Sequence, residues 1–118
     1  MTRKDIHPGY QAVQAAHSIP SFAIQHNEIF TEWYHKSNYL IVLSTDNEDS
    51  LKKLISKAQD RGLKYSVFTE PDIDNQITSI ALEPHEETYK LVSNIPLALK
   101  EYNAHFKQIQ EKEVTNGN

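Results

Sequence analysis

A strand, a helix and a second strand follow one another in the middle of this chain, and this order constrains the fold most. Residues 39–44 are an almost continuous run of β-favouring side chains, which is typical of a strand covered on both faces. Residues 47–61 then carry apolar side chains at helical spacing, behind the capping sequence Thr45-x-x-Glu48. Residues 64–70 return to a strand pattern. We therefore predict an α/β fold with residues 39–44 as its central strand.

The flanking segments add a hairpin and several helices. Residues 71–75 are rich in turn formers and lead into another strand pattern over residues 76–83, so these two strands are expected to be antiparallel. A helix is expected from Pro8 or Gly9 to about Gln25, kinked or divided at Pro20. Further helices are expected over residues 28–36, over residues 85–93, and from Asn94 or Pro96 through Leu97, Leu99, Tyr102 and Phe106.

Length and composition limit the classes of function. With 118 residues the chain suffices for one domain over residues 1–118, with a core over about 8–108 and a polar tail over about 111–118. No apolar stretch approaches the roughly 20 residues that span a bilayer, so a cytoplasmic protein without a membrane partner is expected. The absence of cysteine excludes disulfides and thiol catalysis.

Charge and motif content narrow the choice further. The formal net charge of −4 means that a nucleic-acid partner would need a local basic patch. Basic side chains near one predicted helix form either such a patch or an ordinary solvated face; they are Lys52, Lys53, Lys57, Arg61 and Lys64. The six histidines are scattered and the glycines isolated, so we expect neither a metal nor a cofactor.

A polar stripe marks the first predicted helix. Tyr10, Gln14 and His17 are four and three residues apart and fall on one side of a helix. Such a stripe is either part of a functional site or a solvated helix face. Small side chains offer a surface for close packing, at Ala12, Ala15 and Ala16.

Two short motifs relate the chain to a known family. It reads Gly-x-x-Ala-x-Gln-x-x-His at Gly9, Ala12, Gln14 and His17, and Asp-Ile-Asp-Asn-Gln-Ile at residues 72–77. In order and spacing these motifs resemble the archaeal and eukaryotic-type peptidyl-tRNA hydrolase family. There, a Gly-Lys-Ile-Ala-Ala-Gln-Cys-Ser-His-Ala helix start and an Asp-Ala-Gly-x-Thr-Gln-Ile turn converge at the active site.

The resemblance covers roughly residues 8–100 and implies both a fold and an activity. The implied fold is α/β, a small mixed β-sheet of three to four strands with helices packed on both faces. The implied activity is hydrolysis of the ester that joins a peptidyl or N-blocked aminoacyl group to tRNA, without a metal or other cofactor. A tRNA or a nucleotide-like ligand is the implied partner.

The same resemblance assigns roles to individual residues. His17 and Asp72 would be the acid/base or water-orienting pair, and Gln14 and Gln76 would be amide groups that hold the site or the substrate backbone. Ester hydrolysis needs a group that activates water and a donor for the oxyanion that forms at the carbonyl.

Several departures make the chain a divergent member. Tyr10 stands where the family motif has Lys, so a cation is replaced by a neutral hydroxyl. Asn75 stands at the position of the family's Thr, and Thr78 and Ser79 are the candidates to replace the missing hydroxyl.

The sequence predicts that the family's first strand is missing, because residues 1–7 contain only Ile6 as an aliphatic side chain after Met1. A missing strand would expose a sheet edge, so we predict a homodimer. Four aromatic side chains, Phe30, Trp33, Tyr34 and Tyr39, either supply the dimer contact or pack in the core.

Two functions from different classes therefore remain. One is a peptidyl-tRNA hydrolase or related esterase. The other is a catalytically lapsed relative that binds a nucleotide, a tRNA end or a protein partner in the same pocket. Tyr10, the acidic charge and the missing first strand favour this second function.

Overall fold

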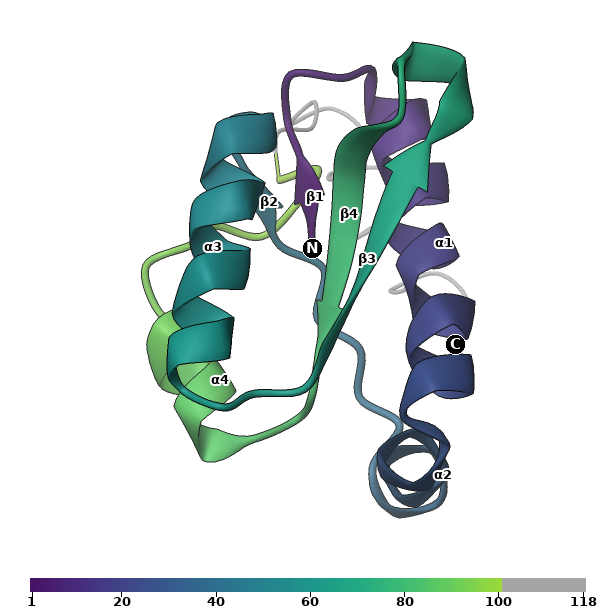
Figure 1. The fold of residues 1–118 in the computed structure, drawn as a ribbon, viewed down its shortest axis with the longest axis vertical. Helices are drawn as coiled ribbons and strands as arrows, with labels where there is room; N and C mark the ends of the chain where they lie inside the picture. Colours follow the sequence, from purple (N-terminus) through teal and green to yellow (C-terminus); the bar gives the residue numbers. More distant parts are fainter. Residues whose placement is uncertain (101–118) are drawn as a thin grey trace, which may run out of the picture.

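The computed structural model describes residues 1–100, which form a four-stranded sheet with helices around it (Figure 1). The elements in chain order are β1 (Thr2–Arg3), α1 (Pro8–Gln25), α2 (Asn27–Lys36), β2 (Ser44–Thr45), α3 (Glu48–Asp60), β3 (Tyr65–Glu70), the 3-10 turn η1 (Pro71–Ile73), β4 (Gln76–Leu82) and α4 (Glu86–Leu91).

The sheet is mixed and has the order β2-β1-β4-β3. β1 is parallel to β2 and antiparallel to β4, while β3 and β4 form the predicted antiparallel pair. The α/β class and the small mixed sheet are thus confirmed. That the whole chain is one domain stays a prediction, and its proposed polar tail lies outside the described residues.

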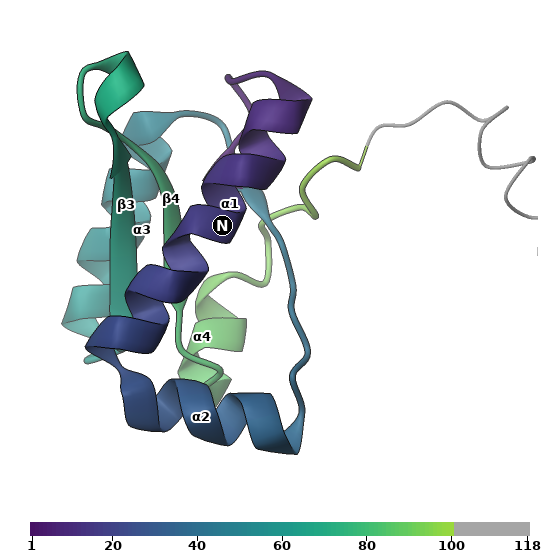
Figure 2. The same ribbon diagram turned by 90° about the vertical axis from the view of Figure 1, so that its right-hand side faces the viewer.

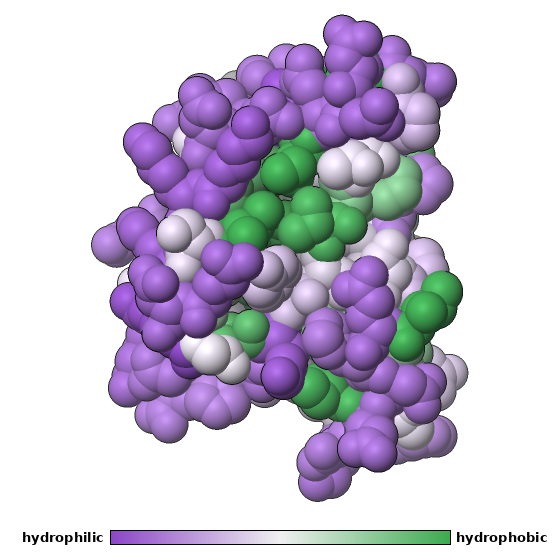
Figure 3. All heavy atoms as spheres, viewed as in Figure 1, coloured by the Kyte–Doolittle hydropathy of each residue, from purple (hydrophilic) through white to green (hydrophobic). Residues whose placement is uncertain are grey.

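The two long helices lie on opposite faces of the sheet. α1 packs against β3 and β4, and α3 covers the other side of β4 (Figures 1 and 2). The α3 side holds the apolar core, in which Leu51, Leu54 and Ile80 are buried. On the face seen in Figure 1, apolar atoms remain visible at the middle, between polar side chains (Figure 3). Because several core neighbours are only partly buried, the core of this small sheet is thin.

The prediction of a central strand over residues 39–44 is wrong. Only Ser44–Thr45 pair, and they form the edge of the sheet next to β1. Tyr39 is 82% exposed, and Leu40 and Ile41 are also exposed. The place beside β4 that a central strand would take is held by β1, so the β-favouring run is left outside the sheet.

The expected loss of the first strand is also wrong, because Thr2 pairs with Ser44 of β2 and with Ser79 of β4, and Arg3 pairs with Thr45 of β2. Thr2 is fully buried, and its hydroxyl donates to the carbonyl oxygen of Thr78 at 3.0 Å. Its backbone N–H donates to Leu43 at 2.9 Å. These hydrogen bonds to distant segments outweigh the weak strand propensity of a polar sequence.

Helix boundaries follow the sequence closely, with three differences. α1 runs without a break through Pro20. α3 is capped by Asn47, whose side chain accepts from the backbone N–H of Ser50 at 3.0 Å, so Thr45 is not the cap. Residues 94–100 are not helical; Leu97 instead bridges to Leu43. The predicted continuation through Tyr102 and Phe106 lies outside the described residues.

Candidate active site

The start of α1 and the turn between β3 and β4 meet at one end of the sheet, at the top of Figure 1. Tyr10 is half-buried there beside two carboxylates. Partial burial, the charge of Glu70, a hydrogen bond with Glu70 and the charge of Asp72 together raise the pKa of Tyr10. The phenol therefore stays neutral and polar in a locally acidic setting.

The turn itself is tightly constrained. η1 is followed by Asp74 and Asn75 in the left-handed region, with φ values of 59° and 57°. Asn and Asp tolerate this conformation better than other side chains. The backbone N–H of Asn75 donates to the carbonyl oxygen of Glu70 at 2.9 Å and closes the turn. Asp72 is thereby presented to solvent from a fixed backbone.

His17 lies further along the same helix. Its ring stacks on Phe68 of β3, with a centroid distance of 4.6 Å and an interplanar angle of 15°. Seven residues of helix place it about 10 Å from Tyr10 along the axis. Within residues 1–100 no hydrogen bond or ion pair joins His17 to Asp72, so the two predicted catalytic residues are not in direct contact. His17 itself is exposed.

Gln14 and Thr78 lie inside the protein, away from solvent. Gln14 is 1% exposed and its Oε1 accepts from the hydroxyl of Thr78 at 2.6 Å. Its carbonyl oxygen accepts from the hydroxyl of Ser79 at 2.5 Å. Thr78 is the extra residue of a bulge, because Phe68 pairs with Ser79 and Thr69 with Ile77. This bulge turns both hydroxyls toward α1, so Gln14 docks the helix on the sheet.

Arg3 organises the same end of the sheet, and sequence reasoning missed it. Its Nε and Nη2 donate to the two oxygens of Asp5 at 2.7 and 2.8 Å, and its Nη1 donates to Oε1 of Gln76 at 2.8 Å. The hydrogen bond with Arg3 lowers the pKa of Asp5, and the hydrogen bond with Asp5 raises the pKa of Arg3. The spacing Arg3-x-Asp5, directly before the first helix, was the one sequence feature that could have indicated this ion pair.

His17 lies apart from the other predicted site residues, which divide into two groups. Tyr10, Asp72, Asn75 and Gln76 lie at or beside the turn end of the sheet, whereas Gln14 and Thr78 are buried between α1 and β4. His, Asp and Glu side chains of residues 1–100 make no group of three that could hold a metal ion.

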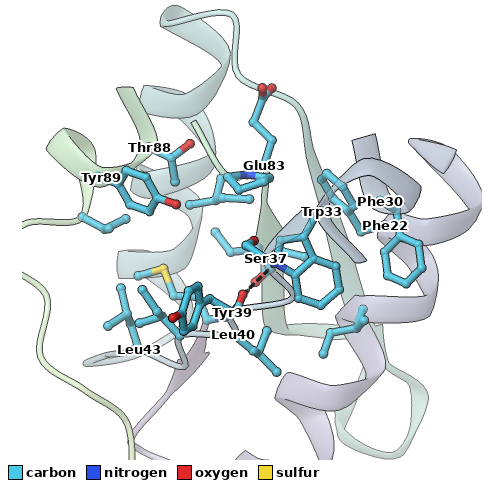
Figure 4. Close-up of a pocket in the computed structure, with 18 residues that line it drawn as sticks. Phe22, Phe30, Trp33, Ser37, Tyr39, Leu40, Leu43, Glu83, Thr88 and Tyr89 are labelled. Atoms are coloured by element: carbon cyan, nitrogen blue, oxygen red, sulfur yellow. Dashed lines mark hydrogen bonds between the residues drawn. The ribbon is translucent and has the colours of Figure 1, made fainter. Parts of the chain in front are cut away.

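A separate cavity of about 260 Å³ opens at the opposite end, near α2. Phe30, Trp33 and Tyr39 line it together with Tyr89 of α4 (Figure 4). The Trp33 indole N–H donates to the carbonyl oxygen of Tyr39 at 2.7 Å and holds the loop there. Phe30 and Trp33 are partly buried while Tyr34 and Tyr39 are exposed, so the aromatic cluster is not ordinary core. No residue of the predicted site lines this cavity.

Fold and site together define a small α/β protein whose polar centre lies at one end of a mixed sheet, between a helix start and a carboxylate-bearing turn. The sequence model of the family described as Peptidyl-tRNA hydrolase PTH2 matches residues 2–102. The chain belongs to this family, as the two motifs had indicated. No curated protein matches it in sequence. No helix in residues 1–100 combines the length and apolar character needed to cross a membrane.

Proposed function

We propose that this chain is a divergent peptidyl-tRNA hydrolase that cleaves the ester between a peptidyl or N-blocked aminoacyl group and tRNA. One observation carries the proposal beyond family membership: the helix start and the acidic turn adjoin, so that Tyr10 lies beside Glu70 and Asp72. A carboxylate and polar donors at one open end of a sheet are the groups that ester hydrolysis needs.

In the proposed reaction, a water molecule attacks the ester carbonyl, the bond between the carbonyl carbon and the ribose oxygen breaks, and the ribose oxygen leaves with the proton that Asp72 has taken from the water. Asp72 orients this water and takes its proton, because it is exposed on a rigid turn beside Tyr10. His17 acts further along the helix, where stacking on Phe68 fixes its ring plane. Asn75 and Gln76 lie next to Asp72 and contact the substrate. Gln14 and Thr78 hold the helix in place.

The tRNA needs cations that the turn does not supply. Three lysines are exposed on α3, namely Lys52, Lys53 and Lys57. The ammonium group of Lys52 forms an ion pair with the carboxylate of Glu48 at 3.5 Å. We assign the acceptor stem of tRNA to this helix, because phosphate contacts come from such lysines. With tRNA as the substrate, we also propose a cytoplasmic location.

A binding function without turnover is the second candidate. Its specific support is that Tyr10, in place of the motif's lysine, stands beside two carboxylates and brings no positive charge to the site. In that case the same end of the sheet holds a tRNA end or a nucleotide-like ligand.

The decisive experiment separates these two candidates. Purified protein is mixed with N-acetyl-aminoacyl-tRNA and release of the N-acetyl amino acid is measured, beside a His17→Ala variant. We expect release by the unmodified protein and at least a tenfold lower rate in the variant. Binding of the tRNA without release above background would replace the hydrolase by the binding candidate.

We also propose a homodimer, now on a different ground. The dimer was first predicted from a missing strand, and that strand is present as β1. A second ground is an exposed apolar surface near the cavity, formed by Tyr34, Tyr39, Leu40 and Ile41. Surfaces of this kind usually mark interaction sites.

The dimer is tested by sedimentation velocity. The full chain is expected to sediment as a dimer at micromolar concentration, and the double variant Tyr39→Ser, Leu40→Ser as a monomer. Val13→Ser, at an exposed apolar position on α1, is the matched control and leaves the dimer intact. A monomeric unmodified chain would contradict the proposal.

A further inference from the structure

Arg3 determines which end of the Gln76 amide is free. A glutamine side chain has an acceptor oxygen and a donor NH₂ group, and the two are easily interchanged in a structure. Arginine carries donors only. Because Nη1 of Arg3 lies 2.8 Å from the Gln76 amide, the atom facing Arg3 must be the oxygen.

The guanidinium that imposes this orientation is itself fixed. Arg3 is 7% exposed, and its two contacts with Asp5 hold the plane of the group. Its Nη1 also donates to the carbonyl oxygen of Ile77 at 3.1 Å. The backbone N–H of Ile77, the second residue of β4, donates to the carboxylate of Glu48 at 2.7 Å. β1 and α3 therefore clamp the first two residues of β4.

Gln76 follows directly on the turn that carries Asp72, and its side chain is only partly buried. With the oxygen engaged by Arg3, the group left to the site is the NH₂. Tyr10, which replaces the lysine of the family motif, lies beside the carboxylates of Glu70 and Asp72 and brings no cation to the site. The site therefore lacks the cation of the family motif but retains an oriented neutral donor.

We propose that the Gln76 NH₂ donates a hydrogen bond to the oxygen of the substrate's ester carbonyl as negative charge develops on it, and that Arg3 is the positioning residue that turns this donor outward. The inference rests on the proposed hydrolase function and specifies how the site compensates for Tyr10. Loss of one such donor typically lowers kcat by about 10²-fold or more.

Two substitutions of Gln76 in the full chain test the donor. Gln76→Glu keeps an oxygen facing Arg3 but has no N–H, and Gln76→Met removes donor and acceptor without adding charge. Both are expected to lower kcat about 10²-fold with KM changed less than threefold. Gln25→Glu, at the exposed last residue of α1 and away from the turn, is the charge-matched control; its carboxylate can still accept from Ser66, and kcat is expected to stay unchanged. Full activity in Gln76→Met, with normal thermal unfolding, would overturn the proposal.

A double-mutant cycle tests the positioning role. Arg3→Lys keeps the charge but loses the planar, multi-point hold on Gln76. We expect it to lower kcat about tenfold in the unmodified chain and less than twofold in the Gln76→Met chain, because its effect passes through Gln76. Equal losses in both backgrounds would mean that Arg3 acts independently of Gln76, and would overturn the positioning role.

Failure of the hydrolase function itself remains distinguishable. If the unmodified protein releases nothing from N-acetyl-aminoacyl-tRNA, the proposed function fails, and Gln76 is tested by binding of a tRNA with an amide in place of the ester. Calorimetry should then show at least fivefold weaker binding by Gln76→Met. Unchanged affinity would overturn the donor role as well.

Discussion

Asp72→Asn is expected to lower kcat for N-acetyl-aminoacyl-tRNA by about 10²- to 10⁴-fold, the range typical for loss of a positioned acid/base group. The amide keeps the size of the side chain and its ability to bind water, but it cannot take a proton at neutral pH. Since Asp72 is exposed and is not part of the core, thermal unfolding should change little. Single-turnover hydrolysis measures the effect.

Asp74→Asn is the matched control for this experiment. Asp74 lies two residues away on the same turn, is also exposed, and has a left-handed backbone that asparagine adopts readily. The substitution removes the same charge from the same turn, so any general electrostatic effect on tRNA binding appears in both variants. Comparable losses in the two variants would show that charge, and not the position of Asp72, governs the rate.

Local patterns predicted the elements whose residues interact mainly with near neighbours. α3 has apolar residues at helical spacing and ends before Gly62, whose φ of 67° favours glycine. β3 and β4 are joined by a turn rich in Pro, Asp and Asn. This connection is too short for a crossover between parallel strands, so the antiparallel pairing could be predicted. In these segments propensity and tertiary structure agree.

Prediction failed where distant segments compete for one place in the sheet. Residues 39–44 have the stronger strand sequence, yet Thr2 and Arg3 occupy the position beside β4. The winning contacts are specific hydrogen bonds, such as that of Thr2 to Thr78, and the Arg3 contacts with Gln76 and Ile77. Hydrophobic patterning contains no information on such contacts.

The site shows the same division. A helix start and an acidic turn were predicted to adjoin, and they do, because both lie at the same end of the β3 and β4 pair. Which polar side chain faces solvent was not predictable, since it depends on a bulge at Thr78 that directs two hydroxyls toward Gln14. A polar residue on a helix stripe can therefore either face solvent at the site or be buried against the sheet, and the sequence does not decide between these roles before the register of the opposing strand is known.

The second large effect concerns Gln14, for which a role in catalysis and a role in packing give opposite expectations. Gln14→Ala is expected to lower the free energy of unfolding by about 3 kcal/mol, because it leaves the buried Thr78 hydroxyl without its acceptor and opens a small cavity. This corresponds to a fall in Tm of roughly 10 °C for a domain of this size. Urea unfolding followed by circular dichroism measures it.

Gln25→Ala is the control on the same helix, because its Oε1 accepts from the hydroxyl of Ser66 at 2.7 Å but the residue is exposed. Ser66 is itself buried, but removal of the exposed Gln25 side chain lets water reach its hydroxyl, so the loss should stay below about 1 kcal/mol. If Gln14 only docks α1 on the sheet, the folded Gln14→Ala protein at low temperature keeps kcat within threefold of the unmodified chain. A hundredfold loss of kcat with normal stability would instead place Gln14 in contact with the substrate, and would require α1 to move away from Thr78 when tRNA binds.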